Sequence, residues 1–281
     1  MLSTLAMMTP SGASWAAESG AETSRPAWLG VWLDDALTGV RVSHVVRGSP
    51  ADRAGLREGD RLAFMDGAQV KDAAQVSRTI ATHLPRERTS LTVVRGTQTF
   101  VLAVVLAENP GAENIIRMEH LGAPAPAWSG AQPLGAAPSS LSQLRGQVVL
   151  LDFWAVWCGP CRIVAPRLGA LQSKFGPQGL RVVGMTTDDA EAAAVYAGRT
   201  GLRYPVVLDP GALVTRAYHV TGLPTLFVID RRGVVRDVGV GFDPSRDAPL
   251  EALIQKLLAE PAPVDGEGVP VGRRDAGSSL R

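Results

Sequence analysis

Cysteine, histidine and long apolar runs are all scarce in this sequence. It has two cysteines and four histidines among 281 residues, too few thiolates for a zinc site built mainly from cysteine. No apolar run approaches the ~20 residues that a membrane-spanning helix needs, so no transmembrane segment is predicted. The net charge of +1 indicates neither a nucleic-acid partner nor another polyanion.

The two cysteines, Cys158 and Cys161, lie two residues apart between two contrasting stretches. The apolar, β-branched run at 147–153 predicts a buried strand, and the spacing of apolar residues at 162–175 predicts a helix. Free N–H groups and the positive end of the dipole at a helix start favour a thiolate. We therefore expect Cys158 to lie at the N-terminus of the helix and to be the attacking thiol. Cys161, one turn inside the helix, would resolve the mixed disulfide.

Two other interpretations of the cysteine pair are weaker. A zinc half-site would need further ligands, and His44, His83, His120 and His219 are scattered along the chain. A purely structural disulfide would close so short a loop that it restricts the unfolded chain little. Dithiol redox chemistry is thus favoured, and no metal is predicted.

The residues around the cysteines resemble a known family. Trp157-Cys158-Gly159-Pro160-Cys161, preceded by Asp152 to Ala155, resembles the active-site segment of thioredoxins. The segment at 187–208 and the run from Gly222 to Asp230 resemble the TlpA-like branch of that family. Strands alternate with helices over 121–261, which predicts an α/β thioredoxin-like domain with helices on both faces of its sheet.

The resemblance implies roles for further residues. Pro224 would be a cis-proline facing the dithiol, so that the backbone of Leu223 can pair with a substrate peptide. Asp152 would be a buried carboxyl group of raised pKa that helps to deprotonate Cys161. We expect His219 to be a surface histidine. The predicted substrate-binding residues are Trp157, Gly159, Pro160 and Leu223.

The sequence of the N-terminal half predicts short strands and two helical stretches. Trp28 to Val31 and the ordered run from Gly48 to Leu62 resemble PDZ domains of the bacterial, protease-associated type. The resemblance implies that a loop takes the C-terminal carboxylate of a peptide, which adds as a strand. Equally, these apolar residues could be ordinary core. No G-x-S-x-G motif accompanies them, so a protease role is not supported. The predicted peptide-binding residues are Leu29, Gly30, Val31, Val76 and Ile80.

The predicted organisation is a mainly-β PDZ-like domain followed by an α/β thioredoxin-like domain. We assign 27–108 to the first, 109–120 to a linker and 121–261 to the second. Residues 262–281 are expected to be a disordered tail, and 1–26 either a signal-peptide remnant or a disordered tail. The partial signal features favour a periplasmic or otherwise extracytoplasmic location, with the cytoplasm as the alternative.

We predict a thiol–disulfide oxidoreductase that reduces protein disulfides through Cys158 and Cys161. Its partners would be disulfide-bearing proteins, an upstream thiol reductant and peptide C-termini at the PDZ-like groove. It needs no cofactor besides its own redox-active disulfide. The alternatives are a disulfide oxidase or isomerase, or a PDZ-based scaffold whose dithiol is incidental.

Overall fold

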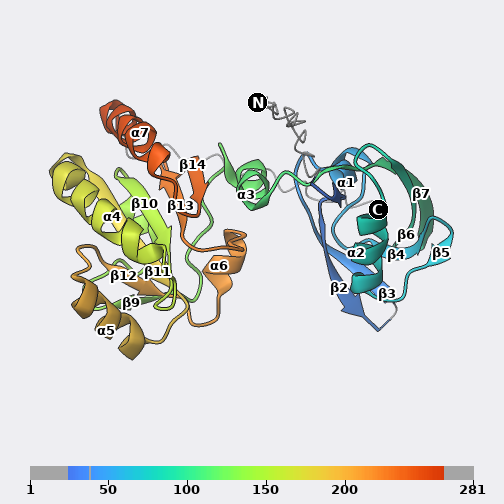
Figure 1. Ribbon diagram of the computed structural model, residues 1–281, viewed down its shortest axis with the longest axis horizontal. Coiled ribbons are helices and arrows are strands. Elements are labelled where there is room, and N and C mark those ends of the chain that lie inside the picture. The colour runs from blue at the N-terminus through green and yellow to red at the C-terminus, as the bar shows by residue number, and fades with distance from the viewer. Residues whose placement is uncertain (1–24, 38, 263–281) are drawn as a thin grey trace, which may run out of the picture.

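The structure is a computed structural model that describes residues 25–37 and 39–262. It has two domains joined through a helix that lies between them (Figure 1). The two predicted tails at 1–26 and 262–281 fall almost entirely outside the described residues. No helix within the described part of the chain is long and apolar enough to cross a membrane.

The first domain is a β-rich unit. Its main sheet has the order β2-β3-β4-β6-β7, with β5 paired to β4, and β1 pairs with β8. Strand β2 is an edge strand, which pairs only with β3 within this sheet. Its elements are β1 (Ala27–Trp28), β2 (Val31–Ala36), β3 (Gly39–Val45), α1 (Pro50–Arg53), β4 (Arg61–Met65), β5 (Ala68–Gln69), α2 (Ala73–Thr82), β6 (Arg88–Arg95), β7 (Gln98–Val105) and β8 (Ala107–Glu108).

Helix α2 begins directly after Asp72 and ends before His83. Asp72 caps the helix, and its Oδ1 accepts a hydrogen bond from the Gln75 N–H at 2.6 Å. One face of the helix packs on the domain core through Val76 and Ile80. The α2 N-terminus is also tied to the sheet, because the Ala73 N–H donates to Asp35 Oδ1 of β2 at 2.7 Å.

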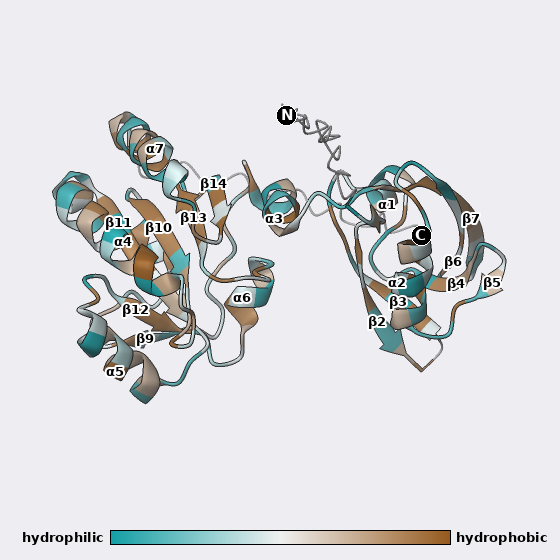
Figure 2. Ribbon diagram, viewed as in Figure 1, coloured by the Kyte–Doolittle hydropathy of each residue, from teal (hydrophilic) through white to brown (hydrophobic). Residues whose placement is uncertain are grey.

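The second domain has a six-stranded sheet in the order β14-β13-β10-β11-β12-β9, with β10, β11 and β12 mutually parallel. Every residue of β10 is buried, and the central strands are apolar along their length (Figure 2). Its strands are β9 (Gln132–Leu134), β10 (Val148–Phe153), β11 (Leu180–Thr186), β12 (Val206–Leu208), β13 (Thr225–Ile229) and β14 (Val235–Val240), and its helices are α4 (Cys161–Phe175), α5 (Ala190–Thr200), α6 (Leu213–Ala217) and α7 (Asp247–Ala259).

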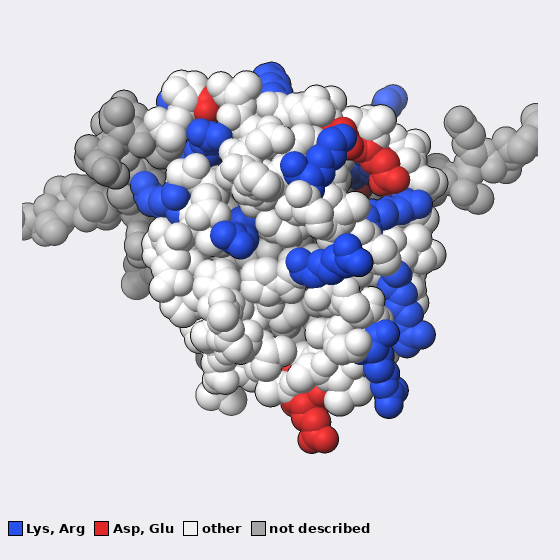
Figure 3. All heavy atoms as spheres, turned by 90° about the vertical axis from the view of Figure 1, so that its left-hand side faces the viewer, with Lys and Arg blue, Asp and Glu red and all other residues white. Residues whose placement is uncertain are grey.

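The alternating side chains of β10 pack into two different cores. Val148 and Leu150 join the apolar cluster under α4 and α7, and Val149 and Leu151 join the cluster on the other face. The predicted α/β architecture with both faces covered is therefore confirmed. Seen from the side away from the PDZ-like domain, basic side chains are scattered over a largely uncharged surface (Figure 3).

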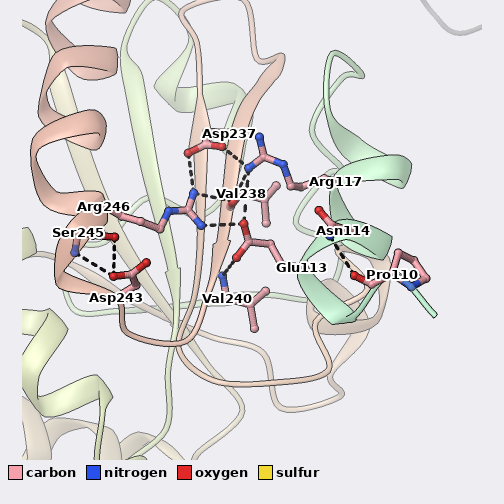
Figure 4. A network of polar contacts seen from close by, with 10 residues as sticks. All are labelled: Pro110, Glu113, Asn114, Arg117, Asp237, Val238, Val240, Asp243, Ser245 and Arg246. Atoms are coloured by element: carbon pink, nitrogen blue, oxygen red, sulfur yellow. Dashed lines mark hydrogen bonds and ion pairs between the residues drawn. The ribbon is translucent and has the colours of Figure 1, made fainter. Parts of the chain in front are cut away.

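The predicted linker at 109–120 contains helix α3 (Ala112–His120). The turn formers Pro110 and Gly111 only precede this helix, and Ile116 is buried in the second domain's core. Charged side chains attach the helix to that domain as well (Figure 4). Arg117 pairs with Asp237 of β14, and Arg246 Nη1 contacts Glu113 Oε1 at 2.8 Å.

The stretch at 122–140 is an ordered part of the second domain. Trp128 is buried in the second domain's core, and β9 pairs with β12 at the edge of the sheet. An edge strand tolerates Pro133, whose missing N–H would interrupt a central strand. Helix α6, for which the sequence suggested nothing, follows β12. These elements depend on tertiary contacts, which a local pattern does not reveal.

Candidate active site

Cys158 lies in the loop between β10 and α4 and forms a disulfide bond with Cys161, their Cα atoms 5.4 Å apart. Cys161 is the first residue of α4, so the prediction that it lies one turn inside the helix is wrong. The chain turns at Gly159 and Pro160 before the helix begins. Pro160 occupies the N-cap position, where its missing N–H costs nothing.

No side-chain oxygen caps the start of α4. The sulfur atom of Cys158 accepts a hydrogen bond from the helix instead. The backbone N–H of Cys161 donates to Cys158 Sγ at 3.2 Å. Once the disulfide is reduced, the same N–H and the positive end of the helix dipole favour a thiolate on Cys158. This geometry makes Cys158 the more acidic candidate of the pair.

The disulfide is enclosed by apolar side chains, but one neighbouring side chain is exposed to solvent. Cys158 and Cys161 are each 2% exposed, within a cluster that includes Trp154 and Tyr196. Trp157, by contrast, is 74% exposed beside them. An aromatic side chain left in water next to a buried redox bond is suited to contact with a partner protein.

The Asp152 carboxyl group is buried in the core at the end of β10. It is 2% exposed, and burial raises its pKa to about 7, although a hydrogen bond from Tyr204 opposes the shift. The Tyr204 hydroxyl donates to Oδ2 at 2.9 Å, and Oδ1 has no hydrogen-bond partner. The sequence did not single out Tyr204, which lies 52 residues further along the chain and meets Asp152 only through folding.

The peptide bond between Leu223 and Pro224 is cis, as predicted. Thr225, the next residue, pairs with Phe153 at the end of β10, which brings the proline to the same end of the sheet as the cysteines. Leu223 is partly buried against the apolar cluster that contains Cys158 and Cys161. The structure thus gathers the predicted thioredoxin-like residues at one place.

The loop predicted to bind a peptide carboxylate has a conformation that only glycine permits. Gly30 has a φ of 86°, and a Cβ added there would lie 2.2 Å from the Ser49 Cβ. The Ser49 hydroxyl donates to the Gly30 carbonyl oxygen at 3.2 Å and holds the loop from behind. Val31 follows as the first residue of edge strand β2.

The apolar residues predicted to line this groove divide into two kinds. Leu29 and Val76 are buried in the core of the domain, whereas Val31 and Ile80 are only partly buried. An edge strand and a nearby helix are therefore present in the arrangement that strand addition requires. Ile80 is the predicted groove residue on α2 that a ligand can still reach.

The histidine predictions are corrected by the structure. His44, His120 and His219, which are scattered along the chain, gather between the two domains. His219 is half-buried and not a surface residue; its backbone has a φ of 54°. Burial lowers the pKa of His219 to about 4. The tertiary contact between the domains produces this cluster, and no sequence motif indicates it.

A C-x-x-C disulfide at a strand–helix junction, beside a cis-proline and a buried aspartate, defines the second domain as thioredoxin-like. The sequence pattern of the AhpC/TSA family matches residues 121–238, and that of the PDZ domain matches residues 27–106. Both predicted domains are therefore confirmed.

Individual relatives match part of the chain. The thiol-disulfide oxidoreductase ResA of Bacillus thuringiensis (strain Al Hakam) is 31% identical over 118 residues, which are 42% of this chain and 67% of that protein. The thioredoxin-like protein YneN of Bacillus subtilis (strain 168) is 34% identical over 112 residues, 38% of this chain and 65% of the relative. A solved thiol:disulfide interchange protein from Chlorobium tepidum TLS is 31% identical with a TM-score of 0.42, covering 48% of this chain and 95% of that chain.

The chain belongs to the TlpA-like thiol–disulfide oxidoreductases and carries a PDZ domain ahead of its thioredoxin-like domain. It is an enzyme that acts through the Cys158–Cys161 pair. Its substrates are therefore disulfide-bearing proteins.

Replacing Asp152 with asparagine is expected to stabilise the oxidised protein above neutral pH. The folded protein binds the Asp152 proton more tightly than the unfolded chain does, since the pKa rises from 3.8 to about 7. The free energy of unfolding of the wild type should therefore fall as the pH rises from about 4 to about 7. The asparagine amide of the variant does not ionise, so the variant should not show this fall. The gain in Asp152→Asn should reach at most roughly 4 kcal/mol above pH 7 and vanish below about pH 4.

Denaturant unfolding of both proteins across this pH range measures the difference. Asp34→Asn, at an exposed carboxylate paired with Arg41, is the control and should give curves parallel to those of the wild type. A gain of equal size at acidic and alkaline pH would contradict a raised pKa for Asp152.

Proposed function

We propose that the enzyme works in the reductive direction. The Cys158 thiolate attacks one sulfur of a substrate disulfide, forms an intermolecular S–S bond and releases one substrate thiolate. Cys161 then attacks Cys158 Sγ, closes the Cys158–Cys161 bond and releases the second substrate thiolate. Two electrons pass to the substrate, and an upstream thiol reductant restores the dithiol. The observation that carries this order is the Cys161 N–H directed at Cys158 Sγ.

We propose that the Asp152 carboxylate accepts the proton that leaves the Cys161 thiol. A carboxyl group with a pKa of about 7 is close to half protonated at neutral pH, so it both accepts and returns a proton. The Tyr204 hydroxyl orients the carboxyl group through Oδ2 and leaves Oδ1 without a protein partner. Asp152 is thus proposed as a general base for the resolving step.

Residues around the dithiol are proposed to hold the substrate. The backbone of Leu223, before cis-Pro224, would pair with an extended peptide segment on either side of the substrate disulfide. The exposed ring of Trp157, together with Gly159 and Pro160, would contact the same segment. No cofactor other than the cysteine pair is proposed.

The PDZ domain is proposed to dock the C-terminus of a partner protein. Edge strand β2 and helix α2 would flank the bound peptide, and the loop at Leu29, Gly30 and Val31 would accept the carboxylate. A partner held there would meet the dithiol at a raised effective concentration. The docked partner is either a substrate or the upstream reductant.

An extracytoplasmic location, with the periplasm as the specific proposal, suits this chemistry. Disulfides persist in oxidising compartments and are rare in the cytosol, so substrates that need reduction accumulate outside it. Fractionation of cells that express the full chain tests this location directly.

The order of attack can be tested by trapping. We expect Cys161→Ser to accumulate a mixed disulfide with a disulfide-bearing probe such as insulin, because the resolving thiol is missing. Cys158→Ser should trap little and should lose reductase activity. Non-reducing electrophoresis and mass spectrometry identify the adduct. Trapping by Cys158→Ser instead of Cys161→Ser would reverse the assigned roles.

The direction of the reaction is tested by the reduction potential of the cysteine pair in thiol–disulfide buffers. A reductase should give a value around −270 mV, as thioredoxin does, whereas a value around −120 mV would indicate an oxidase. Asp152→Asn measured alongside should slow equilibration above pH 7 if the carboxylate assists Cys161. An oxidising potential would overturn the proposed direction and leave the dithiol enzyme intact.

Peptide docking is tested by two arginine substitutions on α2. Ile80→Arg places a charge in the groove and should weaken binding of a valine-terminated peptide by roughly tenfold or more, since an unpaired buried charge is costly. Ser77→Arg, on the exposed face of the same helix, is the matched control. Insulin reduction should be unchanged in both variants. Equal affinities of the free-carboxylate and the amidated peptide would contradict carboxylate recognition.

A further inference from the structure

Side chains from three parts of the chain meet at the junction between the two domains. His44 comes from β3 of the PDZ domain, Glu119 from α3, and His219 from the segment after α6 in the thioredoxin-like domain. The His44 and His219 rings have their centroids 5.0 Å apart, and Trp32 packs on both at 4.5 and 4.3 Å. The dithiol chemistry makes no use of this cluster.

The donor atoms of the three residues converge. One ligand atom from each of His44, Glu119 and His219 lies within 4.8 Å of the other two. His44 Nε2 forms an ion pair with Glu119 Oε2 at 3.2 Å, whereas His219 Nδ1 is buried without a hydrogen-bond partner. Buried polar atoms without partners are uncommon and call for an explanation.

We propose that His44, Glu119 and His219 bind a divalent transition-metal ion, with Zn²⁺ as the best match. Two imidazoles and one carboxylate form a ligand set that zinc accepts in tetrahedral geometry, with the fourth position left for water. Mg²⁺ and Ca²⁺ prefer oxygen ligands throughout, so the two imidazole donors select against them.

Neighbouring groups already orient the donors, as expected for a metal site. His44 Nδ1 contacts Glu58 Oε1 at 2.5 Å, which directs Nε2 toward Glu119. Glu119 Oε1 accepts the Arg47 backbone N–H at 2.9 Å, which leaves Oε2 facing the histidines.

The ion would fix the position of one domain against the other. Helix α3 is attached to the thioredoxin-like domain by the charged side chains shown in Figure 4, and Arg47 of the PDZ domain donates to the Met118 and Glu119 carbonyl oxygens. Coordination by His44 and His219 would add a direct bond between the two domains. We therefore assign the ion a domain-bridging role, independent of the cysteine chemistry.

Zinc binding is measured on the full chain with the Cys158–Cys161 disulfide intact, so that no thiolate competes. Titration against a chromophoric chelator should give one ion per chain. Single variants His44→Gln, Glu119→Gln and His219→Gln should each weaken binding by roughly tenfold or more, and Glu58→Gln by a similar factor. His83→Gln is the control, because this histidine pairs with Asp66 within the PDZ domain.

X-ray absorption at the zinc edge, which does not depend on any variant, should show two imidazoles among the ligands. Limited proteolysis around residues 107–111 should slow when zinc is added to the wild type and not when it is added to His219→Gln. Binding that is equal in His83→Gln and the three ligand variants, or a coordination shell without imidazole, would overturn the site. Either result leaves the dithiol mechanism untouched.

Discussion

The functional part of this protein depends on how strand β10 ends. The strand is buried on both faces, so its direction and register are fixed by two apolar cores at once. Its last residues therefore place Asp152 inside the protein and start the cysteine loop at a defined point. Helix α4 begins at the end of that loop, and its first free N–H meets a sulfur atom. Because the position of the strand is fixed, the distance between the Asp152 carboxyl group and the cysteine sulfur atoms is fixed as well.

Two opposite electrostatic effects operate within this short segment. Burial without a cation makes Asp152 hold its proton to unusually high pH. The unpaired N–H and dipole at the start of α4 do the reverse at Cys158, where they favour the loss of a proton. At neutral pH Asp152 is therefore close to half protonated, whereas a reduced Cys158 is favoured as a thiolate. The proposed mechanism uses both effects, the thiolate for the first attack and the carboxylate for the resolving step.

The connection between the domains is the second constraint. A flexible linker would let the PDZ domain sample many positions, and the effective concentration of a docked partner would then depend on linker length. Helix α3 instead carries charged and apolar contacts to the thioredoxin-like sheet, while Arg47 reaches back to it from the PDZ domain. Under the proposed docking role, a partner bound at the PDZ domain would therefore approach the dithiol along a restricted path.

Local patterns in the sequence placed the C-x-x-C motif at a strand–helix junction, because the residues involved lie close together in the chain. Both domain types and cis-Pro224 followed from resemblance to known families, since few X–Pro bonds are cis without such a match. Tertiary structure alone decided the rest. Trp128 is buried only because the core of the second domain encloses it. Tyr204 becomes a partner of Asp152 only when β12 is in place. His44, Glu119 and His219 show no common signal, since they belong to three separate segments. Their meeting requires two domains to pack against one helix, and that contact is a property of the folded chain.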